Sequence, residues 1–384
     1  MSKYPEFIYS KREVDRAGKA LRGEIIWSED AAPEIRHVFA VANSWRQSHL
    51  FPMRHIQLQL GGQMRRMRIG GVTAARLKRM PSIRKKLRRI SIGLPSIQDL
   101  GGCRVILPTI DDVRRFGEAW GGRHQHVLRE VDDYIADPKD GGYRSLHLMQ
   151  AYADAKYPAF VGRRIEVQVR THLQHTWATA GEAVGLYRNE DLKAGEGNPD
   201  WLRLLYLVAS EFAEHEGCPE VPGSPPARER REEIRDLDTK LIATEVLDRL
   251  SHAFRFTEEY VMEKEYRFLL IEYDHDAKKV TVKGYVNPPE GASSYDRAES
   301  APSLDAVLVS LDRLRNLKAA FPNYFGDVLL FREQLRHITK GRGLMEYDLP
   351  RQALAPPRAY IEPDLSWMKR GRFPRPDQVR RRGD

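Results

Sequence analysis

The sequence of 384 residues has no long apolar segment and only two cysteines. No run approaches the roughly 18 consecutive apolar residues that a membrane span needs, and the first residues are polar and charged, unlike a signal peptide. We therefore expect a cytoplasmic protein with no membrane partner. Cys103 and Cys218 lie in different segments, without CxxC spacing or a nearby histidine pair, so we expect reduced packing residues and no zinc site.

Acidic residues are absent from one long basic stretch. Between Gly61 and Arg89 there are eleven Lys or Arg residues and no Asp or Glu, and the whole chain has a formal net charge of +9 at pH 7. A solvated helix face usually mixes both signs, so this run favours phosphates as partners, whether of nucleotides or of nucleic acid. The alternative is a plain electropositive surface.

The chain also lacks internal repeats, and its patterns divide it into five regions. The Pro/Gly-rich stretch CPEVPGSPPARERREE indicates a linker, and the Pro/Gly-interrupted basic C-terminus is typical of disorder. In chain order, we expect a helical N-terminal element (1–60), a central domain (61–217), the linker (218–235), a smaller α+β C-terminal domain that regulates or senses (236–340) and a basic, disordered tail (341–384).

Strand patterns alternate with helical patterns in the central domain, which predicts the α+β class. DLGGCRVIL is typical of a buried strand, and Thr109 or Asp111 could cap the helix that follows it. HVLREVDDYI, YRSLHLMQAYA and RRIEVQVRT predict three more strands, and the alternation of the last one places Glu166, Gln168 and Arg170 on one face. We expect helix-loop-helix structure in the basic stretch before them, and a hairpin turning at 274–277 in the C-terminal domain.

A candidate phosphate site lies in RLKRMPSIRKK. Ser82 is a plausible N-cap, and a helix N-terminus with a hydroxyl, exposed N–H groups and flanking cations binds phosphate readily. Arg76 and Lys78 precede Ser82, and Lys86 follows it by one helical turn. The alternative interpretation is an exposed basic helix.

Two acids lie beside apolar strand residues. Asp99 precedes the strand GGCRVIL, and Glu166 lies within RRIEVQVRT. Two carboxylates at one end of a sheet, surrounded by Lys and Arg, suit Mg²⁺-dependent phosphoryl-group transfer, in which one acid binds the metal and the other binds it or takes a proton from the attacking hydroxyl. Either acid alone is more often part of a strand-end salt bridge.

Four ordered segments resemble the motifs of the synthetase domain of RelA/SpoT-type alarmone synthetases, over about residues 70 to 190. They are RLKRMPSIRKKL, IQDLGGCRVIL, DYIADPKDGGYRSLH and IEVQVRTHLQHTWA. The resemblance implies a nucleotidyltransferase-like mixed β-sheet flanked by helices. It also implies transfer of the β,γ-pyrophosphate of ATP to the ribose 3′-hydroxyl of a guanine nucleotide, giving (p)ppGpp.

The resemblance also implies roles for single residues. On the ATP side, it implies that Arg76 and Arg104 sandwich the adenine and that three further residues hold the phosphates: Lys78, Ser82 and Lys86. Asp99 would be a magnesium ligand, and Glu166 would bind the metal and activate the 3′-hydroxyl. Tyr143 would stack on the acceptor base, with Lys139 and His147 near the acceptor phosphates.

The chain departs from the family pattern at the acceptor loop. Many alarmone synthetases have Asn two residues before the stacking tyrosine, where this chain has Gly141, so one base-reading amide is missing. The downstream Glu182 and Arg188 are slightly out of register, so no role is carried over to them. No hydrolase domain is recognisable. The family's metal-dependent hydrolase carries its metal ligands on packed helices, whereas the adjacent His-Asp pair of this sequence, His275 and Asp276, lies in a predicted hairpin turn.

Three functions therefore stay open. The first is a pyrophosphokinase that acts on GDP or GTP. The second is a toxin-type enzyme that transfers pyrophosphate to the 3′ end of tRNA, which the basic charge and Gly141 would fit. The third is a catalytically silent nucleotide-binding or nucleic-acid-binding module, against which the two acids argue. A regulatory protein or antitoxin on the C-terminal domain and a homo-oligomer are possible partners.

Overall fold

The computed structural model divides into two compact units, one of which comprises residues 6–254 and 316–354 and the other mainly residues 255–315. This division differs from the predicted boundaries, because part of the region 236–340 belongs to each unit. The structure describes residues 7–24, 32–78, 80–122, 125–188, 190–248, 268–274, 279–285, 294, 297–298, 304–310 and 328–345.

The larger unit begins with three helices, α1 (Lys11–Arg22), α2 (Ala32–Gln47) and α3 (Leu50–Met67). Ser10 caps α1 through a reciprocal capping box with Glu13. Apolar residues of α1 and α2 form one buried cluster with α4 (Met80–Arg89), so these N-terminal helices share a core with the basic stretch.

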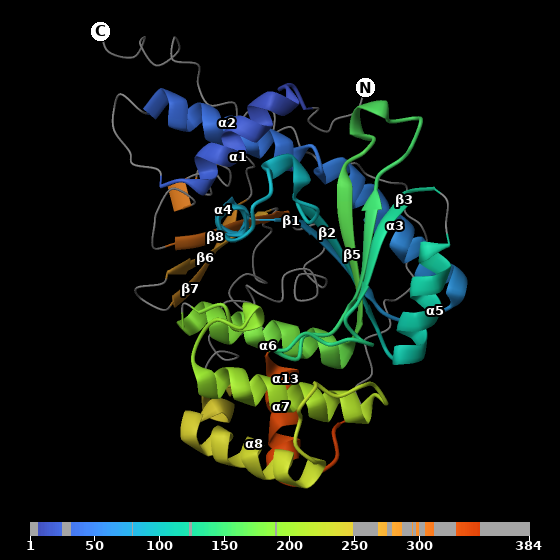
Figure 1. Ribbon diagram of the computed structural model, residues 1–384, viewed down its shortest axis with the longest axis vertical. Coiled ribbons are helices and arrows are strands. Elements are labelled where there is room, and N and C mark those ends of the chain that lie inside the picture. Colours follow the sequence, from blue (N-terminus) through green and yellow to red (C-terminus); the bar gives the residue numbers. More distant parts are fainter. Residues whose placement is uncertain are drawn as a thin grey trace. The chain divides into compact units, whose positions relative to one another are not determined.

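A five-stranded mixed sheet follows, in the order β1-β2-β5-β4-β3 (Figure 1). The strands are β1 (Val72–Leu77), β2 (Gly101–Leu107), β3 (Val127–Asp133), β4 (Leu146–Ala151) and β5 (Arg164–Thr171). β2 and β5 run parallel, and the other pairs are antiparallel. The predicted α+β class and four of the five strands are confirmed, as is the Thr109 cap of α5 (Ile110–Gly121).

The helix-loop-helix prediction for the basic stretch is wrong, because β1 lies between α3 and α4. The sequence of β1, VTAARL, has helix formers at four of its six positions, so local preference does not favour a strand. Antiparallel pairing with β2 along its whole length decides the conformation instead.

The two faces of the sheet differ in polarity. On one face, Val105, Val167 and Val169 are fully buried, and the Cys103 thiol donates to the carbonyl of Met53 in α3. Figure 1 shows α3 and α5 side by side along this region of the sheet. The other face faces α6 (His172–Arg188), which lies against β2 and β5, and it carries charged side chains.

Three further helices extend the larger unit beyond α6. They are α7 (Pro199–His215), α8 (Ala227–Leu241) and α13 (Leu329–Thr339). α7 packs on α6, α8 packs on α7, and α13 contacts both α6 and α8 (Figure 1). The expected linker 218–235 therefore contains more than half of a packed helix.

The smaller unit contains a three-stranded antiparallel sheet in the order β7-β6-β8. Its strands are β6 (Phe268–Asp274), β7 (Lys279–Tyr285) and β8 (Leu304–Ser310). The predicted hairpin strands are confirmed by the antiparallel pairing of β6 with β7, while the His275–Asp276 pair and the tail 346–384 lie outside the described residues. Within the described part of the chain, no helix has the length and apolarity that crossing a membrane requires. Both cysteines are free.

Candidate active site

The candidate site is the polar face of the five-stranded sheet. The register places Arg104 of β2 opposite Gln168 of β5, and Gln168 opposite His147 of β4. Because side chains alternate along a strand, Glu166 and Arg170 share this face with Gln168. Side chains that are far apart in the sequence are thereby brought together beneath α6.

Asp99 lies two residues before β2 and binds two lysines. Its Oδ2 accepts a hydrogen bond from Lys78 Nζ at 2.9 Å, and its Oδ1 lies 3.0 Å from Lys86 Nζ. Burial raises the pKa of this carboxyl, but the charges of Lys78 and Lys86 outweigh burial and hold the pKa below its ordinary value. Asp99 is therefore an anion fixed between the end of β1 and the last turns of α4.

Glu166 is held by a histidine and a glutamine. Its Oε1 lies 3.1 Å from His147 Nδ1, and its Oε2 accepts a hydrogen bond from Gln168 Nε2 at 2.7 Å. Burial raises the pKa of Glu166, and the nearby charge of Asp99 also raises it, but the interactions with His147 prevail and the pKa is lowered. Glu166 is consequently ionised at neutral pH in spite of its burial.

Asp99 and Glu166 lie at the same end of two parallel strands, as the sequence predicts, because Glu166 is opposite Gly102 near the start of β2. Their oxygens fit a hard cation, since Mg²⁺ binds through one or two carboxylates together with phosphates and water. Asp99 Oδ1 is paired with Lys86 and Oδ2 with Lys78, the cations that are predicted to bind phosphates, so a cation bound at Asp99 would lie beside those phosphates. Among the described residues no group of three or more His, Cys, Asp or Glu could hold a metal ion.

The residues predicted to bind ATP lie along β1, β2 and α4. Arg104 is close enough to Arg76 for their charges to interact, although burial and the charge of Arg170 contribute more to lowering the pKa of Arg104 to about 9. Arg104 Nε has no hydrogen-bond partner in the described structure. The two predicted adenine-binding arginines are therefore neighbours on the polar face.

The prediction that Ser82 caps α4 is wrong, because the helix starts at Met80 and Ser82 is its third residue. Proline is favoured in the first turn of a helix, where its missing N–H costs nothing, so Pro81 moves the start of the helix ahead of the serine. The N–H of Ser82 still belongs to the first turn, in which amides lack intrahelical partners. Ser82 thus remains placed for a phosphate contact.

The stretch from Lys139 to Tyr143 forms a tight turn before β4. Gly142 N donates to the Lys139 carbonyl at 2.7 Å. Gly142 has a φ of +90°, and a Cβ there would lie 2.5 Å from the Cβ of Ala209, so only glycine fits. Gly141 differs, because a Cβ there would meet nothing within 4 Å. The turn therefore needs one of its two glycines and leaves room beside the other.

Tyr143, the predicted stacking residue, is only 4% exposed. Its hydroxyl is 2.9 Å from His147 Nε2, while Lys193 Nζ lies 4.9 Å and Lys139 Nζ 5.6 Å from its ring centroid. Burial raises the pKa of the hydroxyl, but His147, Lys193 and Arg170 together lower it to about 7. Tyr143, His147 and Glu166 form a continuous chain of polar contacts.

Sequence reasoning assigned no role to three charged residues at the polar face or near it. Arg170 is 1% exposed, and its Nε and Nη1 have no hydrogen-bond partner in the described part of the chain. Glu182 of α6 pairs with Lys193 at 2.8 Å; burial raises its pKa, but Lys193, Arg76 and Arg104 lower it to about 2. The strand alternation placed Arg170 on this face without a role, whereas nothing in the sequence pattern links Lys193 to Glu182.

Comparison with known proteins agrees with this geometry. The profile of the region found in RelA/SpoT proteins matches residues 75–191, which contain the polar face. This part of the chain is similar to the RelA/SpoT region over about a third of the chain's length. This confirms the resemblance and its extent.

Single relatives match only parts of this chain, at low to moderate sequence identity. The GTP pyrophosphokinase YjbM of Bacillus subtilis is 36% identical over 141 residues, which are 36% of this chain and 64% of that protein. The GTP pyrophosphokinase of Escherichia coli K12 is 26% identical over 183 residues, 45% of this chain and 24% of that protein. The chain therefore spans less than two thirds of the length of these relatives. Among solved structures, small alarmone synthetase 1 of Bacillus subtilis bound to its product pppGpp is 22% identical and has a TM-score of 0.40. That match covers 44% of this chain and 90% of that one.

Proposed function

We propose that this chain transfers the β,γ-pyrophosphate of ATP to the ribose 3′-hydroxyl of a guanine nucleotide, GDP or GTP, in a Mg²⁺-dependent reaction. The observation that carries the proposal is the pair of buried, ionised carboxylates, Asp99 and Glu166, on a cationic sheet face within the RelA/SpoT region. A binding module gains nothing from two ionised acids next to a polyphosphate, whereas a pyrophosphokinase needs both.

On the donor side, Arg76 and Arg104 take the adenine of ATP between their planar guanidinium groups. Lys78, Ser82 and Lys86 bind its phosphates. Both lysines already lie within 3.0 Å of Asp99, so phosphate groups beside them would also be beside that carboxylate. The lysines and the metal ligand therefore act on the same phosphate oxygens.

In the reaction, the acceptor 3′-oxygen forms a bond to the β-phosphorus of ATP, the bond between that phosphorus and the α,β-bridging oxygen breaks, and AMP leaves. Glu166 accepts the proton of the 3′-hydroxyl. His147 keeps Glu166 ionised before the transfer, because His147 Nδ1 lies 3.1 Å from Glu166 Oε1. The other ring nitrogen of His147 contacts the Tyr143 hydroxyl, so the imidazole is fixed and holds Glu166 Oε1 in one orientation.

Asp99 and Glu166 would hold the magnesium ion, with the remaining ligands supplied by phosphate oxygens and water. When bound, the ion supplies Lewis-acid neutralisation of the charge that develops on the phosphates. Arg170, with two unpaired N–H groups on the same face, contributes a further fixed positive charge.

On the acceptor side, Tyr143 offers its ring to the base, and Lys139 lies beside it for the acceptor phosphates. His147 lies near these phosphates, with its two ring nitrogens on Glu166 and Tyr143. The Lys193 ammonium lies over the ring of Tyr143, so a base that stacks there displaces Lys193 from its present position. The released ammonium would then be near the phosphates of the acceptor.

The test is a transfer assay with ATP labelled on its terminal phosphate and Mg²⁺, with GDP, GTP, AMP or deacylated tRNA in separate reactions. We expect label in GDP and GTP and the release of AMP. Label only in tRNA would replace the proposal with the toxin-type reaction, and label in no acceptor with folded protein would leave the silent binding module. A regulatory protein or antitoxin and a homo-oligomer remain predictions.

A further inference from the structure

Arg144, the residue after Tyr143, anchors the acceptor turn to the part of the fold on the side away from the site. The side chain of Arg144 is 3% exposed and is directed away from the site, where Nη1 donates to the carbonyl of Ala209 in α7 at 3.0 Å. Its Nη2 donates to the carbonyl of Pro219 at 2.6 Å. Because Gly142 also packs directly on Ala209, the position of the turn depends on α7 and on the segment that follows it.

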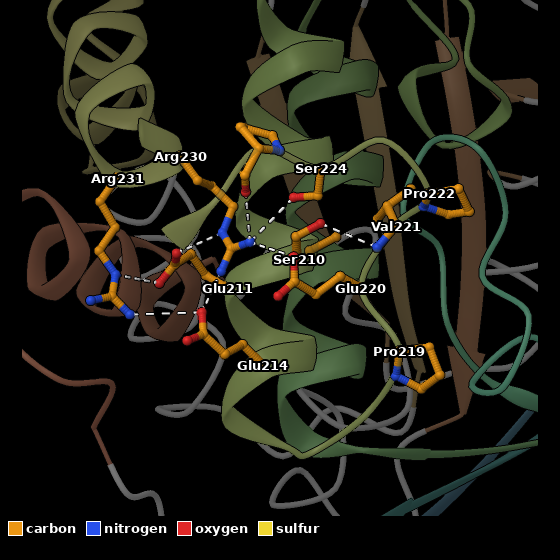
Figure 2. Close-up of polar contacts among 12 residues, drawn as sticks. Ser210, Glu211, Glu214, Pro219, Glu220, Val221, Pro222, Ser224, Arg230 and Arg231 are labelled. Carbon is orange, nitrogen blue, oxygen red and sulfur yellow. Dashed lines mark hydrogen bonds and ion pairs between the residues drawn. The ribbon is translucent and has the colours of Figure 1, made fainter. Parts of the chain in front are cut away.

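That segment, residues 218–224, is in turn fixed by a buried arginine of α8. Arg230 has no exposed side-chain surface, and its Nη1 pairs with Glu220 Oε2 at 2.5 Å, one residue beyond Pro219. Figure 2 shows the arginine between Glu220 on one side and Glu211 and Glu214 of α7 on the other.

Arg230 connects three parts of the fold, namely α8, α7 and the segment 218–224. Its Nε donates to Glu211 at 2.7 Å, and Nη1 also reaches Ser224 at 3.3 Å, so one guanidinium group binds α7 and both ends of the loop (Figure 2). The five donors of arginine form a rigid fork that lysine lacks, so only arginine can hold these groups together. A buried charge with several partners costs much if one side is removed.

We propose that Arg230 is a positioning residue for the acceptor turn. Through Glu220 it fixes the carbonyl of Pro219, that carbonyl fixes Arg144, and Arg144 sets the place of the adjoining Tyr143. The kinetic consequence rests on the proposed function: loss of the link raises KM for the acceptor and leaves KM for ATP unchanged, because the ATP-side residues lie on β1, β2 and α4.

The decisive variant is Glu220→Ala, since this carboxylate is partly exposed and Arg230 keeps both α7 partners. We expect KM for GDP to rise roughly three- to tenfold, the effect of about 1 kcal/mol, with KM for ATP unchanged. Glu220→Gln, which keeps a hydrogen-bond acceptor, restores part of the loss. Glu232→Ala, which removes an exposed pair with Arg228 on the same helix, is the matched control and changes neither constant.

Amide hydrogen exchange tests the positioning without any activity. We expect faster exchange at residues 139–145 in Glu220→Ala and in Arg230→Lys, and unchanged exchange in β1 and α4. Unchanged exchange in the turn, or an equal rise of both KM values, would overturn the proposal. If the unmodified protein transfers label to no acceptor, the proposed function fails, and the exchange data still decide the role of Arg230.

Discussion

The two faces of the five-stranded sheet differ in polarity and in their effect on stability, although alternate residues of the same strands form them. On β5, Val167 and Val169 are fully buried against apolar neighbours, while Glu166, Gln168 and Arg170 form a polar face that is also largely buried. The apolar face gains stability from burial. The polar face loses stability, because it keeps charges away from water and leaves Arg170 without a full set of partners. A face that is costly to fold and cationic in character indicates selection for binding an anion.

Adjacent residues of β5 provide the sharpest way to separate the faces. Glu166→Gln should reduce transfer by roughly 10²–10⁴-fold, because the proposed proton acceptor and metal ligand is lost, with little change in melting temperature. Val167→Ala should lower the free energy of unfolding by about 2 kcal/mol and leave the kcat of the folded protein nearly unchanged. Transfer kinetics and chemical denaturation measure both, and undiminished turnover in Glu166→Gln would remove Glu166 from the mechanism.

A substitution of Arg170 should have opposite effects on stability and on transfer activity. Arg170→Met removes a buried charge of which two N–H groups have no hydrogen-bond partner among the described residues, so the free energy of unfolding should rise by about 1–2 kcal/mol. Transfer should fall about a hundredfold, because a fixed donor aimed at the phosphates is lost. A variant that is both less stable and fully active would show that Arg170 belongs to the structural core.

The His147–Glu166 pair makes part of the stability of the polar face depend on pH. Burial lowers the pKa of His147, but Tyr143 and Glu166 prevail and raise it, so its contribution is complete below the unfolded value near 6.5 and is lost as pH rises through the folded pKa. The pKa of Glu166 is lowered, so Glu166 stays ionised down to below its ordinary value of 4.5.

His147→Gln should therefore have a free energy of unfolding about 1–3 kcal/mol below that of the unmodified protein between pH 5 and 6.5. This difference between the two proteins should become smaller at higher pH. Denaturation at a series of pH values measures it. A difference that widens with rising pH would contradict the ion pair.

The smallest effect is expected at the acceptor turn, where two neighbouring glycines differ. Gly141→Asn has room for its side chain and should raise the preference for GDP over ADP as acceptor about fivefold by adding one hydrogen bond to the base. Gly142→Asn is the matched control and should destabilise the turn, because of its positive φ and the contact with Ala209. Competition between the two acceptors measures the preference, and an unchanged ratio would show that this position does not read the base.

Much of the sheet could be predicted because its strands show clear alternation or short apolar runs. β1 could not, since VTAARL has no strand pattern and pairs only because β2 is beside it. That Asp99 and Glu166 lie at the same end of the sheet beside basic residues could be predicted from residue type and position, while their roles stay a prediction. The pairing of Glu182 with Lys193 and the network around Arg230 depend on how loops return to helices, which periodicity does not encode.

The most direct test of the central claim is the structure of the product made from ATP and GDP. We predict AMP as the second product and, by phosphorus–proton correlation NMR, a diphosphate coupled to the ribose H3′ proton of the guanine nucleotide. Release of ADP, or new phosphate that shows no coupling to H3′, would show ordinary phosphoryl transfer and contradict the account.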